Sequence, residues 1–534
     1  SGTITDANTG EPLPGANVVV TGKLIGASAD SRGQFLIEDV PVGTYELAVD
    51  FIGYARPTIQ VDVQDGETVT ADFQLSISTL SMDEIVVIGS TIRATRKELG
   101  NTVTTIKQQD LAVKDNLTSA LQGKVPGARV TQNSGDPAGG FSVTLRGVSS
   151  IFGSSDPLYV LDGVVISNQS ANVTNLNVFS PGTTIGQNRL ADINPEDIES
   201  IEVIPGGAAA AIYGSRAANG VVLITSKKGV VGEPRYSFTV GYNSNSLRKK
   251  VYTNLLGEQF GSATQRLYPI AGTDPVTGAL TVGRNFSTDK VSVERFDYQD
   301  VVFDRGDGFN SHFSVSGGAN NTTYFASVSH SMNEGIVVNT GYDRSSAKLR
   351  LQQDVTNWMQ VGVGVNYINS FSDEKPDGNV FWSPVNSINI TNNIYDITQR
   401  DEFGNLQSVE PTRVNPASIT ETFDITQNVD RVIADAQIRL NPAKGFTVDY
   451  ILGLDTYGQA GQVFIPPYPY EPVNSSYFDD GYASEAQNNI TQLNSDLNLR
   501  YHRQLNDKLG LATYAGFNAQ FNRAKSQTSQ GRAL

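Results

Sequence analysis

The stretch MQVGVGVNY, residues 359–367, decides the fold class because it alternates apolar residues with polar or small ones. Successive side chains of a β-strand point to opposite faces, so one face of this strand is apolar and the other is not. The second face carries only Gln, Gly and Asn. The apolar face holds Met359, Val361, Val363, Val365 and Tyr367.

The same two-residue period returns in several stretches downstream of about residue 233. These strands run to about ten residues or more, whereas strands of soluble sheets average about five or six. Long alternating strands are typical of a transmembrane β-barrel. A large soluble β-sandwich with a hidden apolar face is the alternative. The other clear examples are VIADAQIRLN (432–441), FTVDYILGL (446–454) and LGLATYAGFNAQF (509–521).

The connections between these strands are unequal. NPAKG and LNDK predict tight turns at one end of the sheet. We expect long loops at 370–428 and 458–488 to gather at the other end. Short turns on one side and long loops on the other favour the barrel over the sandwich.

The composition excludes several classes of protein. The chain has 534 residues with 51 Gly, 21 Tyr and 23 Phe, which suits a mostly β protein, and no apolar run is long enough for a membrane-spanning helix. A net charge of −16 argues against a nucleic-acid partner. The absence of Cys excludes disulfides and thiolate metal sites. His312, His330 and His502 lie far apart in the sequence, and no catalytic motif stands out, so we expect no enzyme, no cofactor and no metal.

Residues 97–229 predict a compact α+β unit. The segment 193–229 reads as a strand, a short Ala-rich helix and a second strand, and Gly214 stands where that helix should end. DPLYVLDGVVI (156–166) predicts two strands broken by a turn at Asp162 and Gly163.

Residues 1–78 read as short strands separated by NTGEPLPG, DSRG and QDGE, which predicts a small antiparallel β-sandwich. The linker that follows, residues 79–96, is unusual because it holds DEIVVI (83–88), two acids followed by four strong β-formers.

Several of these motifs resemble the plug of SusC/RagA-type TonB-dependent transporters: LQGKVPGARV, SVTLRG, DPLYVLDGV and, above all, LADINPEDIESIEVI with the AAAAIYGSRAANGVVLITSKKG that follows it. The N-terminal sandwich resembles the carboxypeptidase-regulatory-like domain that precedes such plugs. The sequence departs from the family at IPGGAAA, where the family more usually has Lys-Asp-Ala-Ser after the strand. This difference falls at the start of the helix, so it leaves open how the N-terminus of that helix is capped. The resemblance implies that residues 97–229 are the plug and 230–534 the first part of a barrel of about 22 strands. Arg146, Asp162 and Gly214 are then structural residues of the plug.

The resemblance also implies a role for the unusual linker. In this family a short segment before the plug, the TonB box, pairs as a strand with the periplasmic protein TonB. An extended backbone with β-branched residues offers the N–H and C=O groups for such pairing, and acids keep the free edge from aggregating. The alternative is a last strand of the sandwich or a buried linker. The predicted TonB-binding residues are Asp83, Glu84, Ile85, Val86, Val87 and Ile88.

The function that the resemblance implies is active import of a large nutrient, a glycan or a peptide, across the bacterial outer membrane. TonB, driven by the ExbB/ExbD motor, would pull the box and remodel the plug. The N-terminal domain and the box would lie in the periplasm, and a SusD-like surface lipoprotein would be a partner. The alternatives are a TonB-dependent signalling receptor and a structural or adhesive outer-membrane protein.

Aromatic residues in the predicted long loops are candidates for contact with substrate. Trp382, Tyr468 and Tyr470 could stack on sugar faces. The alternative is that these side chains only pack the loops against one another.

The barrel predicted from this chain is incomplete. About nine alternating strands lie between 235 and 522, too few to enclose a unit of about 130 residues. The chain also ends in SQGRAL, without a terminal aromatic residue. An open sheet edge in lipid would leave backbone groups unpaired at high cost, so we expect the chain to be an N-terminal portion of a longer protein.

Overall fold

A computed structural model of the chain describes residues 1–7, 9–20, 26–38, 40–51, 57–64, 66–75, 85–88, 92–95, 103–108, 121–132, 134–147, 155–168, 173, 188–260, 270–273, 280–283, 290–319, 321–378, 380, 382–407, 409, 414–467, 480–506 and 509–532. The chain divides into two compact units, Ser1–Ile88 with Ile92–Thr102, and Gly89–Thr91 with Val103–Leu534. Each unit has its own hydrophobic core.

The first unit contains the small sandwich that the sequence predicts. A three-stranded sheet has the order β4-β1-β7 and a four-stranded sheet the order β3-β2-β5-β6. Ile4, Val18 and Val49 are fully buried in the core. A separate pair of strands, β8 (Ile85–Ile88) and β9 (Ile92–Thr95), runs antiparallel with Ile88 opposite Ile92. The other strands are β1 (Gly2–Asp6), β2 (Asn17–Val20), β3 (Gly26–Ser28), β4 (Gln34–Phe35), β5 (Gly43–Asp50), β6 (Thr58–Val63) and β7 (Phe73–Leu75).

The α+β unit begins the second part of the chain. Its five-stranded sheet has the order β10-β15-β16-β13-β14, and a hairpin β11-β12 stands beside it. The Ala-rich helix α3 (Gly206–Tyr213) connects β15 to η3 and β16; its N-cap Pro205 makes no side-chain hydrogen bond. The elements are β10 (Thr104–Lys107), β11 (Ala128–Gln132), β12 (Phe141–Leu145), β13 (Leu158–Leu161), β14 (Val164–Ile166), η2 (Pro195–Asp197), β15 (Ile198–Ile204), η3 (Ser215–Ala217) and β16 (Val221–Ser226).

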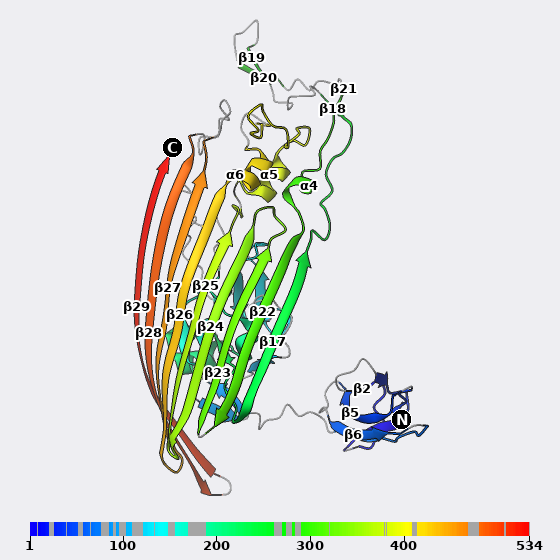
Figure 1. Cartoon of the computed structure of the whole chain (residues 1–534), viewed down its shortest axis with the longest axis vertical. Coiled ribbons are helices and arrows are strands. Elements are labelled where there is room, and N and C mark those ends of the chain that lie inside the picture. Colours follow the sequence, from blue (N-terminus) through cyan, green and yellow to red (C-terminus); the bar gives the residue numbers. More distant parts are fainter. Residues whose placement is uncertain are drawn as a thin grey trace. The chain divides into compact units, whose positions relative to one another are not determined.

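The rest of the described chain is dominated by one antiparallel sheet of nine strands, which confirms the prediction from the alternating pattern (Figure 1). Its strands are 13 to 25 residues long and pair in chain order, from β17 next to β22 through to β28 next to β29. They are β17 (Gly232–Asn245), β22 (Gly306–Ala319), β23 (Thr322–Glu334), β24 (Gly341–Thr356), β25 (Met359–Asp373), β26 (Asp424–Ala443), β27 (Phe446–Ile465), β28 (Tyr482–Asn506) and β29 (Leu509–Arg532).

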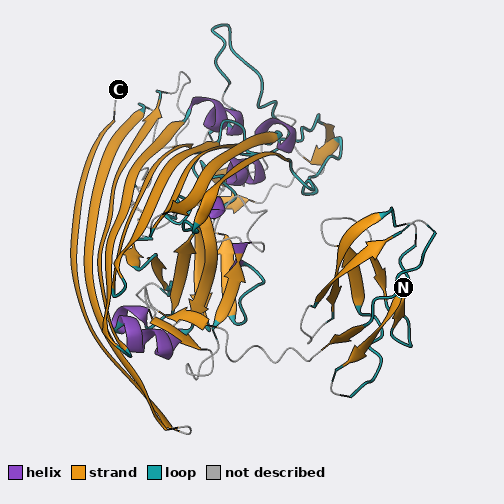
Figure 2. Ribbon diagram, turned by 60° about the horizontal axis from the view of Figure 1, so that its bottom comes forward, coloured by secondary structure: helices purple, strands orange, loops and turns teal. Residues whose placement is uncertain are grey.

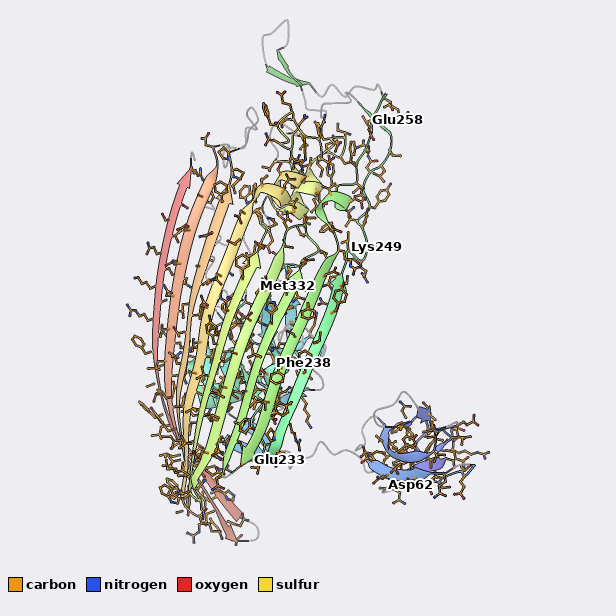
Figure 3. All side chains as sticks on the ribbon, viewed as in Figure 1. Asp62, Glu233, Phe238, Lys249, Glu258 and Met332 are labelled. Carbon is orange, nitrogen blue, oxygen red and sulfur yellow. The ribbon has the colours of Figure 1, made fainter. Side chains whose placement is uncertain are left out.

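This sheet distributes its side chains in the opposite way to a soluble sandwich. On β25, Val363, Val365 and Tyr367 are 43%, 47% and 46% exposed, whereas the polar Asn366 between them is 8% exposed. Phe238 on β17 and Met332 on β23 are also exposed apolar residues (Figure 3). The apolar face is therefore the outer one and the polar face is covered, which is the pattern of a wall in contact with lipid.

The polar face is covered by the α+β unit, around which the nine-stranded sheet curves (Figure 2). Mostly β architecture, an α+β unit and a partial antiparallel barrel are thus the fold class that the sequence predicts. No helix in the described part of the chain is long and apolar enough to cross a membrane.

The two ends of the sheet differ as expected, with corrections to the loop bounds. At one end Ala443 pairs with Phe446 and Ala319 with Thr322 across tight turns. At the other end, β25 extends to Asp373 and β27 to Ile465, so the expected loops 370–428 and 458–488 are shorter than predicted. Strand pairing continues there through residues that do not alternate clearly between apolar and polar in the sequence. A third long connection, 246–305 between β17 and β22, was not predicted.

Short elements occupy these long connections. In its described residues, the connection 374–423 contains two helices that pack on each other. The described residues of the connection 246–305 contain two pairs of short strands and one helix. These elements are β18 (Glu258–Phe260), β19 (Ile270–Thr273), β20 (Leu280–Gly283), β21 (Lys290–Ser292), α4 (Gln299–Val302), α5 (Pro384–Ile390) and α6 (Pro416–Thr422).

Candidate functional site between the α+β unit and the nine-stranded sheet

The edge strand β14 of the α+β unit lies directly on the inner face of β26, β27 and β28. The core of the unit continues into the sheet, because Ile368 and Ile433 belong to the same buried cluster as Val164. Gly453 on β27 leaves room for this contact: a Cβ there would lie 2.9 Å from both methyl carbons of Val164. The contact therefore requires glycine at this position.

A buried arginine joins the sheet to the α+β unit. All five N–H groups of Arg431 on β26 are used, and its side chain is fully buried. Nε and Nη2 donate to the two carboxylate oxygens of Asp455 on β27, at 2.9 and 2.8 Å. The remaining three bonds reach the α+β unit: to the carbonyl of Arg189 (2.7 Å), the carboxylate of Asp192 (3.1 Å) and the carbonyl of Ser167 (3.0 Å).

The partners of Arg431 are themselves linked. Arg189 forms an ion pair of 3.3 Å with Asp192, and the backbone N–H of Ser167 donates to Asp455 at 2.7 Å. Tyr457 lies under the guanidinium, with its ring centroid 5.3 Å away. Removing one member of such a network leaves the other charges buried without compensation, which is strongly destabilising.

A second anchor involves the turn between β13 and β14. Asp162 has φ +49° and Gly163 +93°, the left-handed pair that a tight hairpin turn requires. The Asp162 carboxylate accepts from the backbone and the hydroxyl of Ser226 and forms an ion pair of 3.2 Å with Arg350 on β24. Arg350 also contacts Asp435 at 3.2 Å, and the Gln437 amide donates to the Asp162 carbonyl at 2.8 Å.

The charge of Asp162 is stabilised by this environment. Burial alone would raise the pKa of its carboxyl, but three cations and one hydrogen bond outweigh burial and lower that pKa below its ordinary value. Asp162 is therefore ionised at neutral pH and holds the turn against the sheet as an anion. The groups that lower the pKa are Arg350, Lys348, Lys228 and Ser226.

A third set of contacts lies where β15 begins. Asp197 accepts hydrogen bonds from His312 Nε2 on β22 (3.0 Å) and Ser327 Oγ on β23 (2.7 Å). Burial raises the pKa of Asp197, but the hydrogen bonds from His312 and Ser327 and the neighbouring cation Lys348 together lower that pKa by more than burial raises it. Arg344 on β24 donates to the carbonyl of Ala191 at 2.6 Å. The inner face of the sheet thus receives the α+β unit on several strands.

Comparison with known proteins identifies both segments that precede the sheet. Residues 1–87 match the model of the CarboxypepD_reg-like domain, and residues 95–221 match the TonB-dependent Receptor Plug Domain. The TonB-dependent receptor SusC of Bacteroides thetaiotaomicron is 33% identical over 346 residues, which cover 64% of this chain and 31% of SusC. The chain is similar to the SusC/RagA-type TonB-dependent receptors, and its α+β unit matches the plug domain of TonB-dependent receptors. TonB-dependent receptors are outer-membrane β-barrel proteins.

Other relatives extend the match. The TonB-dependent receptor P39 of Formosa agariphila is 27% identical over 518 residues, or 96% of this chain and 45% of P39. The chain thus spans between about a third and a half of the curated relatives' length. A solved structure titled the RagAB peptide importer in the open-open state superimposes with a TM-score of 0.64 at 22% identity, covering 84% of this chain and 50% of that one. That similarity shows the shared fold.

The structure describes only part of the predicted TonB box. Asp83 and Glu84 lie outside the described residues. Residues Ile85 to Ile88 form β8, and β9 pairs with one edge of it. The two strands form a two-stranded sheet, so no further strand is paired with β8 in the part of the chain that the structure describes. Capture of this segment by TonB stays a prediction.

The predicted substrate contacts are also described only in part. Tyr468 and Tyr470 lie outside the described residues. Trp382 is 9% exposed and belongs to a buried cluster that includes Phe423, Ile465 and Tyr482. This placement favours the alternative that Trp382 packs the loops together, and a role in substrate contact stays a prediction.

The three predicted structural residues of the plug lie at special backbone positions. Arg146 follows β12 with φ +62°, and its N–H donates to the carbonyl of Gly127 at 2.9 Å. Gly214 ends α3 with φ +74°, a conformation that suits glycine. Asp162 makes the turn and the ion pair described above.

Sequence reasoning missed the residues that bind plug to sheet. Arg431, Arg350 and His312 were not singled out as contacts, and neither was Asp192. A signal was present, because Arg431 and Arg350 are cations on strands whose period assigns them to the polar face. A polar face can equally be solvated, so the pattern alone does not identify their partners.

Proposed function

We propose that this receptor imports a large nutrient across the outer membrane in a cycle powered by TonB. The observation that best supports this proposal is that the plug lies on the polar inner face of a sheet whose outer face is apolar. Such an arrangement closes a wide pore at rest, and transport then requires the plug to rearrange.

The TonB box is proposed to be residues 83–88. The segment Ile85–Ile88 is extended, and β9 occupies one edge of it. An incoming strand can add to the other edge or replace β9, and either mode supplies main-chain hydrogen bonds without specific side chains. Pulling on this strand would load the plug through β10, the first described plug strand and the edge strand of the plug sheet.

The buried ion pairs support a plug that rearranges in part. Arg431 and Arg350 hold segments between Asp162 and Asp192, which lie well after β10 in the sequence. We propose that these segments stay on the sheet while the N-terminal part of the plug moves. A SusD-like lipoprotein is the proposed partner at the long-loop end.

Replacement of residues 83–88 by a Gly-Ser segment of equal length tests this function in the native cells. Uptake of fluorescein-labelled oligosaccharides and of labelled oligopeptides would be measured for each variant. We expect uptake of one class in the unaltered receptor and its loss after the replacement, while the same replacement at 76–81 preserves it. Unchanged uptake after loss of residues 83–88 would contradict the proposal and favour an adhesive or structural protein.

A further inference from the structure

A cavity of about 400 Å³ lies between the plug and the inner face of β17, β22 and β23. Its plug side is formed by Gln108 and by Asn194, Pro195 and Glu196. This volume is at the lower end of ordinary ligand pockets, so a large solute needs the cavity to grow.

The sheet side of the cavity is polar and sparsely filled. Gly241, Asn310, Ser331 and Arg344 are successive partners across β17, β22, β23 and β24, so their side chains share the inner face. A Cβ added at Gly241 would meet only the Cβ of Asn310, at 3.9 Å. Small polar residues leave space here, and Ser370, the partner of Arg344 on β25, does not line the cavity.

Hydrogen-bonding capacity is left over at this cavity. Nδ1 of His312 and Nε of Arg344 are buried and make no hydrogen bond with any residue that the structure describes. Both side chains line the cavity. Buried polar groups normally have partners, so a solute or water that reached these nitrogens as the cavity grows would satisfy them.

The plug side of the cavity adjoins the part of the plug that TonB would reach first. Gln108 directly follows β10, and β10 pairs with one described neighbour, β15, through four residue pairs. An edge strand with few pairs opens at low cost compared with a central strand. Loss of β10 would remove Gln108 from the wall of the cavity and so enlarge it.

The contacts of the plug with the following strands of the sheet are buried ion pairs and hydrogen bonds. Asp162, Ser167 and Asp192 are bound to Arg350 and Arg431 of β24 and β26, and the Gln492 amide on β28 donates to the Val165 carbonyl at 2.9 Å. Breaking a buried ion pair there is costly. Beside β22 and β23 the plug is held through Asp197, which His312 and Ser327 contact, so we expect the movement that enlarges the cavity at Gln108 and β10.

We propose that the passage for solute opens by growth of this cavity, along the inner face of β17, β22 and β23. The lining suits solutes that present hydroxyl or amide groups, the chemistry that glycans and peptides share. This inference rests on the proposed TonB-dependent import and adds the side of the plug on which the solute passes.

Single cysteines can test the route without knowledge of the substrate, because the chain has no cysteine of its own. Ser331→Cys places a thiol in the cavity, and Ser370→Cys is the matched control in the same row of paired residues. Thr105→Cys reports on β10 itself. Each variant of the full receptor would be treated with a small cationic methanethiosulfonate reagent, in cells with and without TonB, and the rate of labelling measured.

We expect TonB to accelerate labelling of the Thr105→Cys and Ser331→Cys variants by about tenfold and of the Ser370→Cys variant by less than about twofold, as local opening confined to one side implies. Ser329→Cys, which also lines the cavity, provides a second reporter if Ser331→Cys folds poorly.

Three outcomes would count against the inference. Acceleration in the Thr105→Cys variant without acceleration at either cavity position would overturn the proposed route and leave TonB-driven transport intact. Equal acceleration in the Ser370→Cys variant would also overturn the route. No acceleration even in the Thr105→Cys variant would contradict the import function on which the route depends.

Discussion

Arg431 and Asp455 form a bidentate ion pair, at 2.9 and 2.8 Å, in which both side chains are fully buried between the plug and the sheet. The pair lies on neighbouring strands of the sheet, yet the same guanidinium donates three further hydrogen bonds to the plug. The Arg431 side chain therefore links the pairing of β26 with β27 to the position of the plug.

Substitution of this arginine should loosen the plug. Arg431→Ala leaves Asp455 as a buried anion without its cation and leaves Asp192 with Arg189 as its remaining ion-pair partner, and we expect a loss of about 3–5 kcal/mol in the stability of plug seating. Arg431→Lys keeps the charge but loses the planar fork of five N–H donors, so its loss of stability should be smaller than that of Arg431→Ala but not zero. Protease resistance of the plug in the purified receptor measures the effect.

The matched control is another bidentate arginine in an exposed position. Arg400 donates to both oxygens of Glu421 at 2.9 and 2.6 Å, with both side chains nearly half exposed. Arg400→Ala should cost at most about 1 kcal/mol, because exposed pairs are screened by water. Equal protease sensitivity of the two alanine variants would show that the buried network does not hold the plug.

Gly453 gives a steric test of the same contact. Gly453→Ala would bring a methyl group within 2.9 Å of Val164 and 2.8 Å of the Asn494 amide oxygen, and overpacking of this kind costs about 1–3 kcal/mol. Gly362→Ala is the control, since its nearest new neighbours lie at 3.7 and 3.8 Å. Hydrogen exchange of Val164–Ile166 should accelerate in the first variant alone. Acceleration in both would indicate a general effect of alanine in the strands.

The lowered pKa of Asp162 predicts how the plug responds to acid. A carboxyl whose pKa is lowered in the folded state contributes stability above its unfolded pKa of about 3.9, and loses it as pH falls toward the folded value. The protection factors of residues 158–166, which are the exchange rates corrected for their intrinsic pH dependence, should therefore be the same at pH 7 and pH 5 and should fall below about pH 4. Asp162→Asn should lower the protection factors already at pH 7. A fall in protection between pH 7 and pH 5 in the unaltered protein would contradict this role of Asp162.

The sequence predicted those features that depend on local periodicity. Alternation in MQVGVGVNY assigned each side chain to a face, and the structure exposes Val363 while it buries Asn366. The Asp162–Gly163 turn was predicted for the same reason, because a left-handed pair has a recognisable local signature.

Features that depend on long-range partners were not predictable in this way. Arg431 and Asp192 lie 239 residues apart, and neither carries a local signal for the other. The pairing of Ile85–Ile88 with Ile92–Thr95 was missed because IRAT is a weak strand signal beside IVVI. The predicted bounds of the two long loops were wrong because strand pairing continues into residues that do not alternate between apolar and polar in the sequence.

The most direct test of the account scans Met359 to Tyr367 with single cysteines carrying a fluorescent probe, in the receptor reconstituted into bilayers of brominated lipid. Bromine on the acyl chains quenches only probes that face lipid. Because the apolar face of β25 is the outer one, we expect quenching with a two-residue period and maxima at 359, 361, 363, 365 and 367. Maxima at the even positions, or quenching without alternation, would contradict it.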